Sequence, residues 1–575
     1  MANDATDATV ASAQLGAMRP VDAIADQFVE DYAALDPLTA TYVGIAGYDA
    51  QLPDLSPAGY EQREALIRQT LGRMRSAEPT DDQDRAAKDS FVERLTVTLD
   101  QYAARTPQSR VSVIASELHN LRGVFDLMST ESEDAWSDIN SRLSLIPQRL
   151  DDYRQTLGVS ADEGHISAKR QLGAVADQIR AWTGQEGDSG NFFIGLAEQA
   201  TGVNDRLAAE LLENAERTSA AFGEFGDFLV GDLLPRGKDK DGVGRDQYEP
   251  ESRYFLGAEI DLDETYAWGW DELKRIEDEM LAVSDQIESG ATVDEAVDIL
   301  DADPRRTISG KESFRAWMQQ LATQTIDELA DTHFDIPEPI RRIECRLAPT
   351  NDGGIYYTGP SEDWSRPGQM WWAVPDGIST FSTWREVTTV YHEGVPGHHL
   401  QVAQTAYRHE ILNRWQRTMC WVSGHGEGWA LYAERLMEEL GYLDDPGNKL
   451  GMLDGQALRA ARVIVDIGTH LELEIPRDNP FGFHPGKIWN ADLALEFMHG
   501  HCRLEDAVIA FEVNRYLGWP GQAPAYKIGE RIWLQARDEV KQRQGSDFDL
   551  KQFHRNALDL GSLGLDPLRE ALARV

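Results

Sequence analysis

The chain has 575 residues, 41% of them hydrophobic, and its 55 Lys and Arg against 98 Asp and Glu give a formal net charge of −43. This composition supplies a large hydrophobic core and excludes the fibrous and intrinsically disordered classes of protein. The negative charge repels nucleic acids and anionic membranes, and neither a signal-peptide pattern nor an apolar run of ~18 residues is present, so we expect a cytoplasmic protein that binds neither.

Most of the chain carries a helical pattern. Residues 1–17 are small and polar and are expected to be a disordered terminus. Beyond them apolar residues recur at helical spacing, which predicts one large helical domain over residues 18–575, and the charged, glycine-containing run near 235–245 predicts a break between two lobes or a long loop. Strand-like patterns are confined to one region, with candidates at 343–347 and around 354–357 next to a Trp-rich loop at 364–372. The sequence therefore predicts a mostly α fold with a small β element.

Three of the 13 histidines lie close together, at His392, His398 and His399. Apolar residues before them predict a helix that ends near His392 and Glu393. The familiar zinc pattern places two histidines at i and i+4 on one helical face, with a Glu beside the first as general base. Here position i+4 is Pro396, so the familiar pattern is broken.

The broken pattern restricts which histidine can be the second ligand. In a straight helix His398 would lie about 120° around the axis from His392, and His399 roughly 10 Å along it, so neither could share a metal with His392. Pro396 has no N–H and clashes with the carbonyl of residue 392, so the helix must bulge or restart. A two-residue bulge, with Pro396 as the first residue of the continuing helix, would bring His398 to the role normally held at i+4. We therefore favour His398 as the ligand and expect His399 to support the site, while His399 stays the alternative ligand.

A catalytic zinc ion usually takes three protein ligands and leaves one position for water. The three cysteines lie far apart in the sequence, so nitrogen and oxygen atoms must hold the metal. A helix predicted to begin at about Glu427 offers the third ligand, because two helices joined by about 30 residues can pack with their polar groups facing. Glu434 follows seven residues later on the same face, ~10 Å along, where it can support Glu427 from behind but cannot bind the same ion.

A polar stripe on an apolar helix gives candidates for a second role. Arg462, Asp466 and His470 step by four residues, and Asp466 can orient His470 so that its other nitrogen meets developing negative charge. Tyr526, or with less support Tyr516, is a further candidate donor to that charge. An internal ion-pair network would explain Arg462 and Asp466 without chemistry, so both interpretations stay open.

The chain resembles the bacterial family known as domain of unknown function 885 in four motifs: His-Glu-x-x-Pro-Gly-His-His at 392–399, Glu-Gly-Trp-Ala-Leu-Tyr-Ala-Glu at 427–434, Asp-x-Gly-x-His at 466–470 and Pro-Gly-Gln-Ala-x-x-Tyr at 520–526. Similarities near both ends extend the resemblance over nearly the whole chain. It implies a zinc metallopeptidase of the gluzincin group, with a two-lobed helical fold and a deep central cleft similar to angiotensin-converting enzyme or carboxypeptidase Taq. By position it implies His392, His398 and Glu427 as ligands and Glu393 as the base.

The expected function is a zinc-dependent hydrolase that cleaves peptide bonds with one zinc ion and Glu393 as general base. Its expected partner is a peptide or a small amide, and the sequence leaves the oligomeric state open. Two alternatives remain, namely a zinc-dependent amide or ester hydrolase acting on a non-peptide small molecule, and a metal-binding protein without activity. Paired Glu-x-x-His motifs and a Gly-x-Ser-x-Gly elbow are absent, which argues against a di-iron enzyme and a serine hydrolase.

Overall fold

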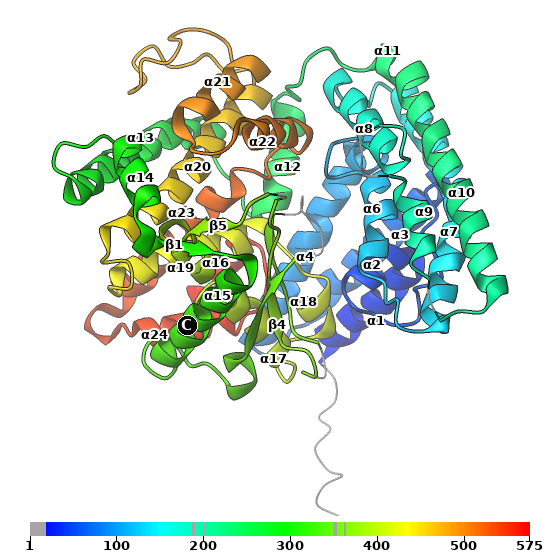
Figure 1. The fold of residues 1–575 in the computed structure, drawn as a ribbon. Helices are drawn as coiled ribbons and strands as arrows, with labels where there is room; N and C mark the ends of the chain where they lie inside the picture. Colours follow the sequence, from blue (N-terminus) through cyan, green and yellow to red (C-terminus); the bar gives the residue numbers. More distant parts are fainter. Residues whose placement is uncertain are drawn as a thin grey trace, which may run out of the picture.

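The computed structural model describes residues 19–186, 190–200, 202–348, 354–361, 364–375 and 377–574, and helices dominate it as predicted (Figure 1). The prediction of a disordered terminus at residues 1–17 lies outside the described residues. Within the described residues, no helix combines the length and the apolar character needed to cross a bilayer.

We use "first lobe" for residues 20–236, which are entirely helical in their regular elements. These are α1 (Pro20–Leu35), α2 (Pro37–Tyr42), α3 (Pro57–Ser76), α4 (Asp82–Ala103), α5 (Thr106–Ser109), α6 (Glu117–Gly123), η1 (Val124–Asp126), α7 (Glu133–Asp162), α8 (Lys169–Trp182), α9 (Phe192–Glu198), α10 (Asp205–Phe228), η2 (Leu229–Leu233) and α11 (Leu234–Arg236).

We use "second lobe" for residues 245–574, which contain the strands. Its helices are α12 (Arg245–Leu256), α13 (Leu262–Ile287), α14 (Val293–Ala302), η3 (Pro304–Arg306), α15 (Lys311–Leu329), η4 (Glu338–Arg341), α16 (Thr383–Glu393), α17 (His398–Tyr407), α18 (Arg414–Thr418), α19 (Ser423–Glu439), α20 (Pro446–His470), α21 (Ala491–His501), α22 (Asp506–Gly518), α23 (Ala525–Gln544), η5 (Gly545–Asp547), α24 (Leu550–Leu558) and α25 (Leu565–Leu572). Its strands are β1 (Thr307–Ser309), β2 (Ile343–Leu347), β3 (Ile355–Thr358), β4 (Gly368–Trp372) and β5 (Thr380–Ser382).

The hydrophobic cores follow the two lobes. One core lies mainly among α6 to α10 and ends at Leu233, whereas the largest core consists, apart from Ala86, of residues from Tyr248 to Leu572. The change falls at the segment for which the sequence predicts a break. Figure 1 shows the blue and cyan helices of the first lobe on one side and the green to red elements of the second lobe on the other.

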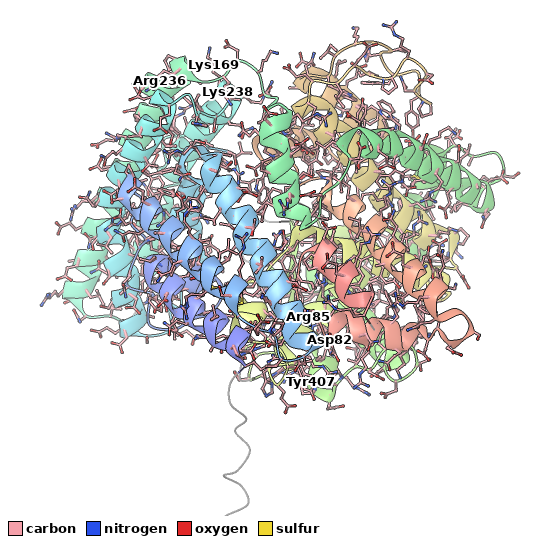
Figure 2. All side chains as sticks on the ribbon, turned by 180° about the vertical axis from the view of Figure 1, so that it is seen from behind. Asp82, Arg85, Lys169, Arg236, Lys238 and Tyr407 are labelled. Atoms are coloured by element: carbon pink, nitrogen blue, oxygen red, sulfur yellow. The ribbon has the colours of Figure 1, made fainter. Side chains whose placement is uncertain are left out.

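Packing as well as the connecting segment joins the lobes. A third core of α1, α3 and α4 includes Trp415 and Cys420 from the second lobe, and α4 also packs on α12 and α25. The connection itself is held to α8, because the backbone N–H of Lys169 donates to the carbonyl of Lys238 at 2.9 Å. Figure 2 shows Lys169, Arg236 and Lys238 together at this end of the first lobe.

The small β element is larger than predicted. A three-stranded sheet has the order β2-β4-β3, with β2 parallel and β3 antiparallel to β4, and β1 pairs with β5 in a separate antiparallel ribbon. The expected strands correspond to β2 and β3, but β4 falls in the segment predicted to be a Trp-rich loop. Most of β4 is buried on both faces, and such a strand lacks the alternation of polar and apolar residues by which strands are predicted.

Helix α20 forms the centre of the second lobe and carries part of the site. It packs against α13 and α16, and every residue from Ala460 to His470 is buried. Pro446 at its first position and the Asp445 carboxylate, which accepts from the N–H of Asn448, fix where it begins. A helix that is apolar on nearly all sides is stable only when other elements surround it.

Candidate metal centre

The helix carrying His392 ends at Glu393, as predicted, and α17 begins at His398. Four residues separate the two helices, so the predicted two-residue bulge beginning a new helix at Pro396 is wrong. The N–H of Gly397 donates to the carbonyl of Tyr391 at 3.0 Å, and a Cβ at Gly397 would lie 1.9 Å from the carbonyl oxygen of His392. Only glycine permits so close a return of the backbone. The break therefore directs His398 back toward His392, with 4.8 Å between the two ring centroids.

Glu427 completes the convergence of these side chains. It lies on α19, which packs on both α16 and α17, and its Oε2 is 3.5 Å from Nε2 of His392 and 3.3 Å from Nε2 of His398. Charge-assisted N–H···O bonds are shorter, at about 2.7–2.9 Å. Two ligands that are each about 2.0–2.1 Å from one tetrahedral zinc ion are about 3.4 Å apart. The separations of these three side chains are therefore compatible with one shared zinc ion.

Helix α19 begins at Ser423, four residues before the predicted start at Glu427. The glycines near its beginning favour a loop in the sequence, but they serve close helix packing in the structure. A Cβ at Gly428 would lie 2.4 Å from the backbone of Gly529 on α23. This close contact sets the position of α19 against α23, and with it the position of the Glu427 carboxylate.

Glu393 is a second carboxylate beside the imidazoles. His392, Glu393 and His398 are buried and offer ligand atoms that all lie within 4.8 Å of one another. The Glu427 oxygen is nearer to both rings, so the distances favour Glu427 over Glu393 as the third ligand. Oε2 of Glu393 is buried without a hydrogen-bond partner among the described residues, and burial raises the pKa of this carboxyl.

Glu434 forms a hydrogen bond with His392, whereas the sequence predicted that it would support Glu427. Nδ1 of His392 donates to Oε1 of Glu434 at 2.7 Å, and Oε2 of Glu434 accepts from the hydroxyl of Thr388 at 2.7 Å. With Nδ1 as the donor, Nε2 faces Glu427 and His398 and can bind a metal ion once it has lost its own proton. Burial opposes the charged imidazole, but hydrogen bonds to Glu427 and Glu434 raise the pKa of His392 to about 10. Despite burial, the charge of His398 and hydrogen bonds to both imidazoles lower the pKa of Glu427, and the hydrogen bond to His392 lowers the pKa of Glu434.

His399 faces away from this cluster. Its Nε2 donates to the carbonyl of Ile340 at 2.7 Å, so Nδ1 accepts from the hydroxyl of Tyr357 at 2.9 Å. Burial lowers the pKa of His399 to about 4, which leaves the ring neutral. Neither nitrogen contacts a member of the cluster, so the predicted supporting role is limited to positioning Tyr357.

The prediction that His470 donates to a reacting oxygen does not agree with its position. His470 is fully buried outside the cavity of the cluster, and its Nε2 donates to the carbonyl of Tyr516 at 3.0 Å. Asp466 accepts instead from the hydroxyl of Tyr248 at 2.6 Å and the N–H of Gly521 at 2.9 Å, and its other oxygen is 3.8 Å from Nε2 of His470. Sequence spacing places this stripe on one face of α20 but does not reveal which neighbours that face meets.

Tyr516 is also occupied elsewhere. Its hydroxyl donates to Glu512 at 2.5 Å and accepts from Nε of Arg462 at 2.8 Å, while Arg462 reaches the same carboxylate at 2.7 Å. Tyr526, the favoured candidate, lines the cavity of the cluster beside Glu427. Burial and the Glu427 carboxylate raise the pKa of Tyr526 to about 12, so its hydroxyl keeps its proton at neutral pH.

The cluster opens into a cavity of about 560 Å³. All its lining residues lie between Ile355 and Tyr526, in the second lobe. A separate cavity of about 60 Å³ is lined by residues of both lobes. The deep central cleft implied by the resemblance stays a prediction. The wall also contains features for which the sequence predicts no role, among them Thr388, Arg459 and strand β3. Thr388 lies one helical turn before His392, a signal that the spacing contains, whereas nothing in the sequence places β3 beside α16.

A family model described as "Bacterial protein of unknown function (DUF885)" matches residues 37–572. The chain belongs to this family. Among solved structures, "the putative lipoprotein from Colwellia psychrerythraea" is similar to this chain, with a TM-score of 0.82 and 22% sequence identity. The match covers 96% of this chain and 98% of that one. A "putative lipoprotein of unknown function from Shewanella oneidensis" has a TM-score of 0.72 and 18% identity, over 96% and 99%. At these identities the similarity shows the fold alone, and no curated protein matches the chain.

Proposed function

We propose that this DUF885 protein is a zinc-dependent hydrolase of the gluzincin type that cleaves peptide bonds. His392, His398 and Glu427 would hold one zinc ion, and Glu393 would act as the general base. The observation that supports this most is the approach of the Glu427 oxygen to both imidazole nitrogens, at 3.3 and 3.5 Å, at the wall of a cavity.

The chemistry divides between the ion and the side chains. A bound zinc ion supplies Lewis acidity, which activates a water molecule and polarises an acyl carbon. Glu393 lines the same cavity with an unpartnered oxygen, so it can accept a proton from that water and pass it to the leaving nitrogen. Tyr526 lines the cavity with its hydroxyl protonated and can donate to the acyl oxygen as negative charge develops there.

Strand β3 favours a peptide over a small amide or ester. It is an edge strand of its sheet, and Ile355, Tyr356 and Tyr357 line the cavity. An edge strand presents backbone N–H and C=O groups that lack partners within the sheet, and an extended peptide can pair with them. A small amide without a peptide backbone cannot use this wall.

The substitution Glu393→Gln tests the proposal, because it keeps the size of the side chain and removes the proton acceptor. We expect zinc content by mass spectrometry to match the wild type and hydrolysis of a peptide mixture to fall roughly 100- to 10,000-fold. Glu198→Gln, an exposed site on the first lobe, is the control for the change of charge. Normal peptide hydrolysis in Glu393→Gln would overturn the assigned base. A zinc-loaded wild type that cleaves other amides or esters but no peptide would overturn the substrate.

A further inference from the structure

Arg459 on α20 is an arginine side chain in the wall of the cavity that holds His392, His398 and Glu427. One terminal nitrogen of its guanidinium donates to the carbonyl of Gly455, one turn earlier in the same helix, at 3.1 Å. Its Nε is buried without a hydrogen-bond partner. Among the described residues, no carboxylate oxygen lies within 4.0 Å of the guanidinium.

The neighbouring Arg462 shows the contrast. It lines the same cavity one helical turn later, but it donates to the carboxylate of Glu512 at 2.7 Å and to the hydroxyl of Tyr516 at 2.8 Å. Arg462 is thus paired with side chains of the protein, whereas no carboxylate of the described residues contacts the guanidinium of Arg459. In a chain with 98 acidic residues and a net charge of −43, an arginine without a carboxylate partner is not explained by a shortage of acids.

The carboxylates of the site do not contact this guanidinium directly. Both oxygens of Glu434 are taken by His392 and Thr388, and Glu427 lies against the two imidazoles. The charge of Arg459 acts on Glu393 and Asp454, but neither carboxylate lies within 4.0 Å of it. A guanidinium in a partly enclosed cavity gains most from an anion that binds two of its N–H groups side by side. The free donors of Arg459 are therefore suited to a carboxylate supplied by the ligand.

We propose that Arg459 binds the free α-carboxylate of a peptide, so that the enzyme removes residues from the carboxyl terminus. This inference rests on the proposed function, because a peptide backbone carries one anionic group and that group is at its end. In the step, the oxygen of water bonds to the acyl carbon, the C–N bond of a peptide unit near the carboxyl terminus breaks, and the leaving nitrogen takes up a proton. The products are a shortened peptide with a new carboxylate and the released carboxyl-terminal fragment with a free amino group.

The test compares pairs of N-acetylated peptides that end either in a free acid or in a carboxamide. We expect the zinc-loaded wild type to cleave the acid with a kcat/KM about 10- to 100-fold higher, the range of a charge-assisted hydrogen bond. Arg459→Met should lose this preference, and Arg459→Lys should keep part of it because the charge remains. Arg206→Met, an exposed site 86% accessible, changes the net charge equally and should keep the full preference. Unaltered zinc content and thermal unfolding show that each variant is folded.

Binding gives a second readout that does not depend on turnover. The dissociation constants of the acid and the amide are measured by calorimetry with zinc-loaded Glu393→Gln, with and without Arg459→Met. The acid should bind about 10- to 100-fold more tightly, and only when Arg459 is present. Equal cleavage and equal binding of acid and amide would overturn the role of Arg459 while leaving peptide hydrolysis intact. A preference that follows an internal Asp or Glu in amidated peptides would overturn it too. If no peptide is cleaved, the proposed function fails, and equal binding would overturn Arg459 separately.

Discussion

Glu434 offers a quantitative test of how the site is built. Its carboxylate is 1% exposed and has two contacts, one to Nδ1 of His392 and one to the hydroxyl of Thr388, both at 2.7 Å. Glu434→Ala removes both and leaves the N–H of His392 without an acceptor. Loss of such a supporting contact typically weakens metal binding about 10- to 100-fold, which is about 1.4–2.7 kcal/mol. We therefore expect the zinc dissociation constant to rise by that factor.

Two further variants divide this effect between its sources. Glu434→Gln keeps an oxygen for His392 and loses the charge, so its zinc affinity should lie between those of Glu434→Ala and the wild type. Thr388→Val removes only the distal hydrogen bond and should change zinc affinity least. The assay is competition for zinc against a fluorescent chelator at one pH and ionic strength. Wild-type affinity in Glu434→Ala would refute the argument that this carboxylate orients a ligand.

Three other substitutions test the structure around the site. His470→Ala should bind zinc normally and hydrolyse peptide at a rate within a few-fold of the wild type. Its free energy of unfolding in urea should fall by about 1–3 kcal/mol, because the buried carbonyl of Tyr516 loses its donor. A large loss of kcat at normal stability would instead support the catalytic role. Gly397→Ala should abolish folding or zinc binding, because its Cβ would meet the carbonyl of His392, whereas Gly158→Ala, where no atom lies within 4 Å, should keep or raise the melting temperature. Arg462→Met should cost about 1.5–3 kcal/mol in urea unfolding, because Glu512 loses one charge-assisted hydrogen bond but keeps Arg515 at 2.9 Å, and an unchanged midpoint would contradict the pairing.

The sequence contains the information that places the cluster of side chains. The apolar period sets the end of α16, and the missing N–H of Pro396 requires a break that separates His392 from His398 without separating their side chains. Helical length and the distance to Glu427 make a second helix beside the first a reasonable expectation. These are local constraints, which periodicity and proline chemistry express directly.

Other features depend on packing between distant segments. The position of β4 follows from burial on both faces, which hides the strand pattern in its sequence. The stripe of α20 faces Glu512, Tyr516 and Gly521, and no spacing within the helix reveals those partners. The hydrogen bond of His470 to the carbonyl of Tyr516 could not be predicted for this reason. The start of α19 was misplaced because its glycines indicate a loop when read alone and close packing against α23 when their neighbours are known.

The most direct test of the central claim is a crystal structure of the zinc-loaded protein, with diffraction data collected on both sides of the zinc absorption edge. We expect one anomalous peak per chain, about 2.0–2.2 Å from Nε2 of His392, Nε2 of His398 and a carboxylate oxygen of Glu427. Glu393 should lie next to the peak without binding it. A peak ligated by His399 or Glu393 in place of these residues, or no peak in this cavity at saturating zinc, would contradict it.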